Sequence, residues 1–256
     1  MAKAKRLPLE GCYVISLRPV GAHASLRRAA AAQGARLLAL SPWRIETQDD
    51  AGTRRALRAA LAAGIVVATS PAAVRSASAL HALRARRGQV WCAVGAGTAA
   101  ALHRAGIDVV VSPTRMDSEG LLALDALRNV RGCEVGLLAA PGGRDLIAPA
   151  LRKRGARVLR ADVYRRVETT PSPVALARLR ALRTKPWIAL SSGEALRCTL
   201  SRLPADLSGK LRGANVAAAS ERLAQVARDA GFRARTVVAA SAQPRDLIAA
   251  MAAAIG

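Results

Sequence analysis

Aromatic residues are scarce in this chain: its 256 residues include only three tryptophans, two tyrosines and one phenylalanine. Because 52% of the residues are nonetheless hydrophobic, the core must consist mainly of alanine, leucine and valine. Proteins that bind single-stranded nucleic acids stack the bases on aromatic side chains. The shortage of such side chains argues against that class of function.

Cysteine and histidine are also scarce, and their spacing matches no common metal site. The chain has no CxxC pair and no metal-ligand spacing among its cysteines and histidines, which are Cys12, Cys92, Cys133, Cys198, His23, His81 and His103. Structural zinc sites and disulfide frameworks need such groupings. We therefore expect no metal site and no disulfide, and we predict that the cysteines are single buried thiols.

Long hydrophobic runs are missing. Every stretch of about 18 residues contains a charged residue or a proline, so we predict no membrane span. Residues 1–10 are basic, but no apolar segment follows them, which argues against a secretory signal. The expected location is the cytoplasm.

Acidic residues are few: 17 aspartates and glutamates face 40 lysines and arginines, and the formal charge is +23. Such a charge fits nucleic acid, an anionic membrane surface or an acidic small molecule. The arginines, however, are spread over nearly every predicted helix, as on a solvated surface. We therefore predict no specific nucleic-acid or membrane partner. Compositional bias without any partner stays an open alternative.

The segments that are present alternate between strand, polar turn and helix. Residues 65–68 form an unbroken apolar run, as is typical of a parallel strand buried on both faces. We predict one helix over 71–86, a strand over 109–111 and one helix over 118–127. This alternation indicates an α/β fold with parallel sheets.

Two distant segments are similar to each other. Residues 34–46 and 155–168 both begin with Gly-Ala-Arg and both end with an aromatic residue, arginine and glutamate. We interpret them as two linker strands, at about 36–46 and 158–168, between two similar lobes. The predicted lobe 1 is residues 1–40 plus 169–256, and lobe 2 is residues 42–163.

Polar turns follow most of the predicted strands. In parallel sheets these turns lie at the carboxyl edge, where backbone N–H groups and helix N-termini suit carboxylate or phosphate oxygens. Our candidates for substrate binding are Arg18, Thr69, Ser70, Thr98, Ser118, Gly143, Arg144, Ser191, Ser192 and Ser220. The alternative for each hydroxyl is an ordinary helix N-cap. Tyr164, in the second linker strand, is either a packing residue or a proton donor.

Several motifs resemble those of the uroporphyrinogen-III synthases, in the same order along the chain. They are Val14-Ile-Ser-Leu-Arg-Pro19, Ala68-Thr-Ser-Pro-Ala-Ala-Val74, Ala93-Val-Gly-Ala-Gly-Thr-Ala99, Ser118-Glu-Gly-Leu-Leu122, Gly142-Gly-Arg144 with Gly155-Ala156, and Val163-Tyr-Arg165. The resemblance covers essentially the whole chain. It implies two similar flavodoxin-like lobes with parallel sheets, joined by a two-stranded linker, with the active site in the cleft.

The resemblance also implies an activity. Members of this family close linear hydroxymethylbilane, a tetrapyrrole with many carboxylates, into uroporphyrinogen III, with loss of water and inversion of the last ring. The expected enzyme is a monomeric lyase without a cofactor. By the same resemblance Tyr164 assists the loss of the hydroxyl, and Thr98 and Ser70 face the cleft.

The chain departs from the family pattern in its last quarter. Residues 220–224 read Ser-Glu-Arg-Leu-Ala where the family has Gly-Pro-x-Thr-Ala, so only Ser220 carries over, and Arg222 is a candidate to compensate. Ser192-Gly193 replaces Ser-Pro. A non-catalytic two-lobed binder of polyanionic molecules or nucleic acid is the alternative function.

Overall fold

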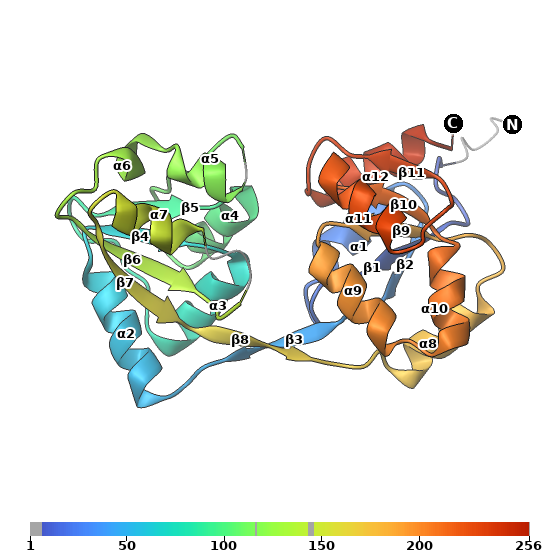
Figure 1. Cartoon of the computed structure of the whole chain (residues 1–256), viewed down its shortest axis with the longest axis horizontal. Coiled ribbons are helices and arrows are strands. Elements are labelled where there is room, and N and C mark those ends of the chain that lie inside the picture. The colour runs from blue at the N-terminus through green and yellow to red at the C-terminus, as the bar shows by residue number, and fades with distance from the viewer. Residues whose placement is uncertain (1–6, 116, 143–145, 256) are drawn as a thin grey trace, which may run out of the picture. The chain divides into compact units, whose positions relative to one another are not determined.

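The computed structural model describes residues 7–115, 117–142 and 146–255. The chain divides into two compact units: unit 1 is Met1–Arg44 with Val167–Gly256, and unit 2 is Ile45–Arg166. Unit 2 is thus one continuous segment, while unit 1 is made from two (Figure 1). Within the described residues, no helix is long and apolar enough to cross a membrane.

Unit 1 is built on a parallel sheet with the strand order β11-β10-β9-β1-β2. Its strands are β1 (Tyr13–Ser16), β2 (Arg36–Ala39), β9 (Trp187–Leu190), β10 (Asn215–Ala218) and β11 (Thr236–Val238). Its helices are α1 (Ala24–Ala32), α8 (Pro173–Ala181), α9 (Gly193–Arg202), α10 (Ala205–Arg212), α11 (Glu221–Asp229) and α12 (Pro244–Ala253). Alternate residues of β1 serve the two faces of this sheet. Val14 packs with Leu26 of α1 and Ile248 of α12, and Ile15 is fully buried.

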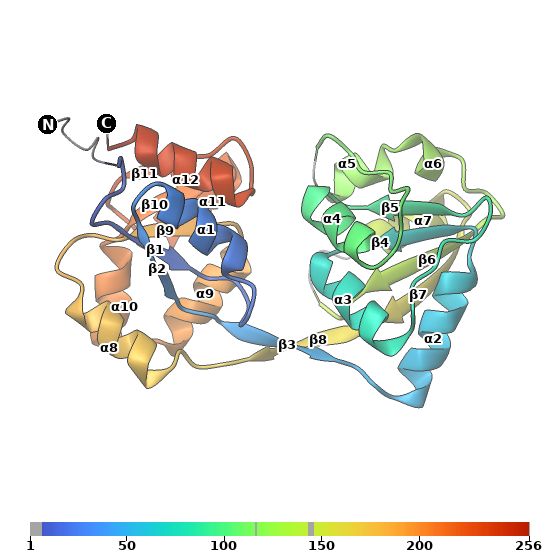
Figure 2. The same cartoon turned by 180° about the vertical axis from the view of Figure 1, so that it is seen from behind.

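Unit 2 is built on a parallel sheet with the strand order β5-β4-β6-β7. Its sheet strands are β4 (Ile65–Ala68), β5 (Val90–Ala93), β6 (Glu134–Ala139) and β7 (Arg157–Asp162). Its helices are α2 (Ala51–Ala62), α3 (Pro71–Leu80), α4 (Ala96–Arg104), α5 (Ser118–Leu122), α6 (Asp125–Arg128) and α7 (Ile147–Lys153). One core cluster joins the sheet to α2, α3 and α4, and a second joins it to α5, α6 and α7. Figures 1 and 2 show these two faces, with α7 toward the viewer in the first and α3 in the second. The predicted α/β fold with parallel sheets is therefore confirmed.

The two units share one strand order. Numbered within unit 1 alone, the order is 2-1-3-4-5, as in flavodoxin-like folds. In unit 2, β6 and β7 take the places of β1 and β2, and β4 and β5 take the places of β9 and β10. Val111, bridged to Cys92, takes the place of β11. Unit 2 is therefore a circular permutation of unit 1. Its order reverses between β4 and β6, where ligands bind in such sheets.

The similar segments found in the sequence are each divided into two strands. In the first, residues 40–42 separate β2 from β3 (Trp43–Thr47); in the second, Val163 separates β7 from β8 (Tyr164–Glu168). The first strand of each pair belongs to the sheet of a unit. The second strands pair with each other in a two-stranded sheet, β3-β8.

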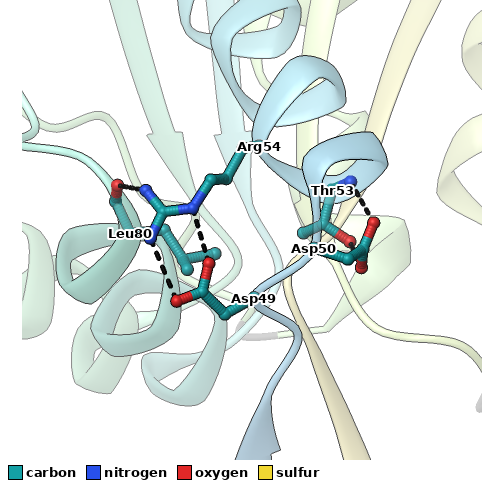
Figure 3. A network of polar contacts seen from close by, with 5 residues as sticks. All are labelled: Asp49, Asp50, Thr53, Arg54 and Leu80. Carbon is teal, nitrogen blue, oxygen red and sulfur yellow. Dashed lines mark hydrogen bonds and ion pairs between the residues drawn. The ribbon is translucent and has the colours of Figure 1, made fainter.

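Helix α3 ends at Leu80, so the helix predicted over 71–86 is too long. The reason lies in another element (Figure 3). Arg54 of α2 donates from Nη1 to the Leu80 carbonyl at 3.1 Å, and Asp49 holds the same guanidinium through Nε at 2.5 Å. Asp50 beside it caps α2 through the Thr53 N–H at 2.9 Å. The carbonyl at the end of α3 is thus satisfied without a further helical turn.

Two other predicted elements are also wrong. The segment 109–111 makes only the single bridge of Val111 to Cys92, and Val109 is 80% exposed. The helix predicted over 118–127 is two short helices, α5 and α6. Arg154 donates from Nη1 to the carbonyl of Leu122, at the break, and to that of Leu127, within α6, both at 2.6 Å.

Gly136 in the middle of β6 lets α2 approach the sheet closely. A Cβ at this position would lie 2.0 Å from the Ala60 carbonyl oxygen of α2. The matching position of unit 1, Ile15 on β1, carries a large buried side chain. The two units therefore share a strand order but differ in how closely a helix packs on the sheet.

Candidate functional site

A cavity of about 210 Å³ lies at the carboxyl edge of the unit 2 sheet, at the switch point between β4 and β6. We call it the unit 2 pocket. Four of the residues predicted from the sequence line it, and two arginines join them. These six are Thr69, Ser70, Ser118, Tyr164, Arg160 and Arg166. Apolar side chains such as Val94, Leu137 and Ile147 form other parts of the wall.

Tyr164 and Ser70 are hydrogen-bonded to each other in this pocket. The Tyr164 side chain belongs to the core cluster under α2, α3 and α4, and only 4% of the residue is exposed. Its hydroxyl lies 3.1 Å from Ser70 Oγ. The same Oγ accepts the Ala73 N–H at 3.0 Å and so caps α3, whose first residue is Pro71. A buried ring with its hydroxyl at a pocket wall is a suitable arrangement for a positioned proton donor.

Thr69 precedes Ser70 but is bonded to a different element. Its hydroxyl donates to the Leu138 carbonyl at 2.9 Å, and its N–H donates to the same oxygen at 3.1 Å. The hydroxyl proton of Thr69 is therefore already engaged in a hydrogen bond to β6. Toward a ligand in the pocket, this hydroxyl can act only as an acceptor.

Arg160 and Arg166 were missed by the sequence analysis. Arg160, on β7, is held in place: Nε donates to Asp162 Oδ1 at 2.9 Å, and Nη2 donates to the Ala140 carbonyl at 3.0 Å. Its side chain is 22% exposed. Arg166 lies two residues beyond Tyr164 on β8, where side chains point to the same face of a strand. That spacing from the tyrosine was the signal that could have indicated Arg166.

The remaining unit 2 candidates differ in what the structure describes of them. Ser118 is the first residue of α5, whose N-cap is Asp117. Thr98 lies on α4, is 2% exposed and is not among the pocket-lining residues. Gly143 and Arg144 lie outside the described residues. Ser118 is therefore the one of these four with an observed position in the pocket wall.

The other four candidates lie at the carboxyl edge of the unit 1 sheet. Ser192 caps α9 through the Ala195 N–H at 3.2 Å, and Ser220 caps α11 through the Leu223 N–H at 3.4 Å. Ser191 is exposed. Arg18, two residues after β1, is partly buried, and this burial lowers the pKa of its guanidinium. The N-cap interpretation holds for Ser192 and Ser220 as it does for Ser70, so capping alone does not distinguish the two edges.

A buried histidine joins two strand ends in unit 1. His23 is 7% exposed, and its two ring nitrogens lie 2.9 Å from the hydroxyls of Ser16 and Ser41. Burial lowers its pKa, and the charges of Arg27 and Arg18 lower it further. A neutral imidazole, which donates from one nitrogen and accepts at the other, fits between the two hydroxyls.

The cysteines are not the four buried thiols that we predicted. Only Cys92 is buried, and that burial raises the pKa of its thiol to about 11. Cys12 and Cys198 are partly buried, and Cys133 is exposed. Cys133 follows turn residues and precedes β6, outside the sheet, so its position on the chain next to a strand did not imply burial. No group of three or more potential metal ligands occurs among the residues with described positions.

Comparison with known proteins identifies the family. A family model described as "Uroporphyrinogen-III synthase HemD" matches residues 24–249. The chain belongs to the uroporphyrinogen-III synthase family. The resemblance drawn from the sequence motifs is thereby confirmed.

Curated relatives in this family are similar over part of their length. The uroporphyrinogen-III synthase of Escherichia coli K12 is 33% identical over 145 residues, which are 56% of this chain and 59% of the relative. That of Salmonella typhimurium LT2 is 33% identical over 161 residues, 60% of this chain and 65% of the relative. The matched part of the chain thus spans less than two thirds of each of these uroporphyrinogen-III synthases.

Solved structures titled as uroporphyrinogen-III synthases share the fold. The structure from Helicobacter pylori 26695 has a TM-score of 0.61 at 10% identity, with 96% of this chain and 100% of that chain covered. A mutant from the extremely thermophilic bacterium Thermus thermophilus has a TM-score of 0.58 at 20% identity, with 96% and 99% covered. At these identities the likeness supports the fold and not the assignment of individual residues.

Proposed function

We propose that this protein is a uroporphyrinogen-III synthase, which closes hydroxymethylbilane into uroporphyrinogen III with loss of water and inversion of the last ring. Membership of the family supports the reaction. The observation that carries the proposal is the Tyr164 hydroxyl, which lines a pocket together with Arg160 and Arg166. The substrate carries many carboxylates, and guanidinium groups bind carboxylates well. No cofactor is required by this scheme.

The first step of the proposed reaction is departure of the hydroxyl from the end of the bilane. Tyr164 gives its proton to that hydroxyl, the carbon–oxygen bond breaks, and water leaves. The electron pair of the pyrrole nitrogen stabilises the carbon that remains. The phenolate left on Tyr164 is stabilised by its hydrogen bond with Ser70.

The second step is ring closure with inversion. The substituted α-carbon of the last ring attacks the electron-poor carbon and forms the first new carbon–carbon bond. The bond from that same ring carbon to its original methylene bridge then breaks, with the positive charge passing to the methylene carbon. The free α-carbon of the ring bonds to this methylene carbon and loses its proton, which restores the Tyr164 hydroxyl. Atoms and charges balance over the two steps, since one bilane gives one macrocycle and one water. The remaining task is to hold a flexible chain in a folded-back conformation, which is a large contribution to rate in its own right.

We further propose roles for the other candidates. Arg18, Ser191, Ser192, Ser220, Thr98, Ser118, Thr69, Gly143 and Arg144 would bind carboxylates or ring nitrogens of the substrate. The protein would act as a monomer in the cytoplasm. Sedimentation at several protein concentrations tests the monomer, and a concentration-dependent mass would contradict it.

The product isomer tests the proposed function. Purified protein is mixed with hydroxymethylbilane made enzymatically, and the oxidised products are separated by chromatography. We expect the III isomer in excess over a reaction with heat-treated protein. A product with no inverted ring, together with measurable bilane binding by calorimetry, would instead support a non-catalytic binder of polyanions.

A further inference from the structure

The two hydroxyls that follow β4 have different roles in hydrogen bonding. Each hydroxyl has one proton to donate and two lone pairs. The Thr69 proton goes to the Leu138 carbonyl. Ser70 Oγ uses a lone pair for the Ala73 N–H. Ser70 is therefore the hydroxyl whose proton is available for Tyr164, 3.1 Å away.

The electrostatic field of α3 favours one direction for the Ser70–Tyr164 hydrogen bond. The helix has ten residues, and its N-terminus, which Ser70 caps, carries a partial positive charge. Oxygen atoms are favoured toward such a terminus and hydrogen atoms away from it. The Ser70 proton then points toward the Tyr164 oxygen, and the Tyr164 proton points away from the helix.

We propose that Ser70 is a positioning residue that directs the Tyr164 proton into the unit 2 pocket. The hydrogen that Ser70 donates lies on one side of the Tyr164 oxygen. The Tyr164 hydrogen therefore cannot point toward Ser70 and is directed to the other side. The same donated bond stabilises the phenolate that remains after proton transfer. The catalytic part of this inference rests on the proposed function, but the direction of the hydrogen bond does not.

The direction of the bond can be measured without substrate. The chain has two tyrosines, so the Tyr13→Phe variant leaves Tyr164 alone. Its ultraviolet resonance Raman ring doublet distinguishes a hydroxyl that accepts a hydrogen bond from one that only donates. In the Tyr13→Phe background we expect an accepting hydroxyl, and we expect loss of that signature with Ser70→Ala. A donor-only signature before the Ser70 change would overturn the proposal.

Three substitutions at Ser70 separate capping from proton donation. Ser70→Thr keeps both, and turnover should stay within about twofold. Ser70→Ala removes both, and we expect kcat to fall roughly 2–13-fold, as for one lost hydrogen bond, with KM nearly unchanged. Ser70→Asp keeps the cap but accepts the Tyr164 proton, so its kcat should fall to that of Tyr164→Phe. A rise in KM with unchanged kcat in Ser70→Ala would make Ser70 a substrate ligand instead.

A matched helix cap controls for stability. Ser172 caps α8 through the Ala175 N–H at 3.2 Å, and Pro173 follows it, as Pro71 follows Ser70. Ser172→Ala should lower the free energy of unfolding by about 1 kcal/mol, as is usual for an N-cap, and leave kcat unchanged. If Ser172→Ala lowers kcat as much as Ser70→Ala does, the effect is one of stability and the proposal fails.

A double variant tests whether Ser70 acts through Tyr164. In the Tyr164→Phe background, Ser70→Ala should lower kcat no further, because the proton it directs is gone. Additive losses would contradict the proposal. If the parent protein makes no uroporphyrinogen III, the proposed function fails, and the Raman result alone then decides the direction of the bond.

Discussion

Trp43 and Tyr164 occupy equivalent positions in the two units, one at the start of β3 and one at the start of β8. Both are buried, at 6% and 4% exposure. Ser192 and Ser70 are equivalent as well, since each caps the helix that follows the central strand of its sheet. The tyrosine has a hydroxyl that donates and accepts, whereas an indole N–H only donates. The duplicated scaffold thus supplies the same cap twice, and in unit 2 the equivalent aromatic residue carries a hydroxyl that lies 3.1 Å from the cap, Ser70 Oγ.

The carboxyl edges also differ in what occupies them. In unit 1, His23 joins Ser16 and Ser41 with a neutral, buried ring. In unit 2, the edge holds a cavity with Arg160 and Arg166 in its wall. At one edge a buried histidine bridges two hydroxyls, and at the other polar groups line a cavity. Four changes test this comparison, from the largest expected effect to the smallest.

The first is Gly136→Ala, which should selectively destabilise unit 2. The added Cβ would lie 2.0 Å from the Ala60 carbonyl oxygen. This oxygen belongs to the backbone of α2, which cannot move aside as easily as the end of a side chain. We expect a loss of about 3 kcal/mol or more, at the upper end of overpacking costs. Ile15→Val at the matching position of unit 1 should cost only about 0.5–1.5 kcal/mol. Urea unfolding measures both, and a smaller loss in Gly136→Ala than in Ile15→Val would refute the close-packing argument.

The second is Tyr164→Phe, which keeps the ring and removes the hydroxyl. We expect kcat to fall at least tenfold, a lower bound on the ~10²–10⁴-fold contribution of a general acid. The melting temperature should change little, and the residual product should still be the III isomer. Trp43→Phe is the control: some stability is lost, and kcat is retained. Wild-type turnover in Tyr164→Phe would make Tyr164 a packing residue.

The third concerns the pH dependence of unit 1. The pKa of His23 is lowered from its ordinary value of 6.5 by burial and then by Arg27 and Arg18. The unfolded state therefore binds more protons in mild acid. The contribution of His23 is complete above pH 6.5 and decreases as the pH falls from 6.5 toward the lowered pKa.

Urea titrations at about pH 7.5, 6.5 and 5.5, which span the ordinary pKa of histidine, measure how the free energy of unfolding changes with pH. In a Trp91→Phe background, the fluorescence of Trp43 and Trp187 reports on unit 1. His23→Gln should flatten the slope, whereas His81→Gln, at an exposed position in unit 2, should leave it unchanged. An equal slope in His23→Gln and the parent would show that the buried imidazole is not the titrating group.

The fourth is the reactivity of the thiols in unit 2. Cys133 is exposed, whereas Cys92 is buried and the pKa of its thiol is raised to about 11. The thiolate is the reactive form. At pH 8 (roughly the ordinary range of a thiol) an alkylating reagent should modify Cys133 rapidly and Cys92 only as unit 2 opens. Peptide mass spectrometry measures the two alkylation rates. Equal rates for Cys133 and Cys92 would mean that β5 does not shield Cys92 from the reagent.

The sequence predicted what depends on local pattern. Ile65–Ala68 is a continuous apolar run and forms a central parallel strand, and Ser70 and Ser192 both precede helices that they cap. The similar segments indicated a duplication because their strand and turn residues repeat in order. These features are visible because each is determined by neighbouring residues.

What the sequence could not predict depends on residues far along the chain. Helix α3 stops at Leu80 because Arg54 of another helix binds its carbonyl. Arg160 is held in the pocket wall in part by the carbonyl of Ala140, which follows β6 and lies 20 residues earlier in the chain. Before the fold is known, an arginine in a chain with 40 basic residues gives no sign of such a role.

The circular permutation has a consequence for synthesis on the ribosome. Unit 2 is complete once Arg166 has emerged, whereas the unit 1 sheet still lacks its central strand β9 and the strands β10 and β11 beyond it. At the usual ~5–20 residues per second, several seconds pass before those strands follow. During that interval the edge of β1 that later pairs with β9 has no partner strand, while all residues of unit 2 have already been made. The order of translation therefore allows unit 2 to begin folding before unit 1. It leaves the unpaired edge of the N-terminal strands as the part of the nascent chain most exposed to aggregation.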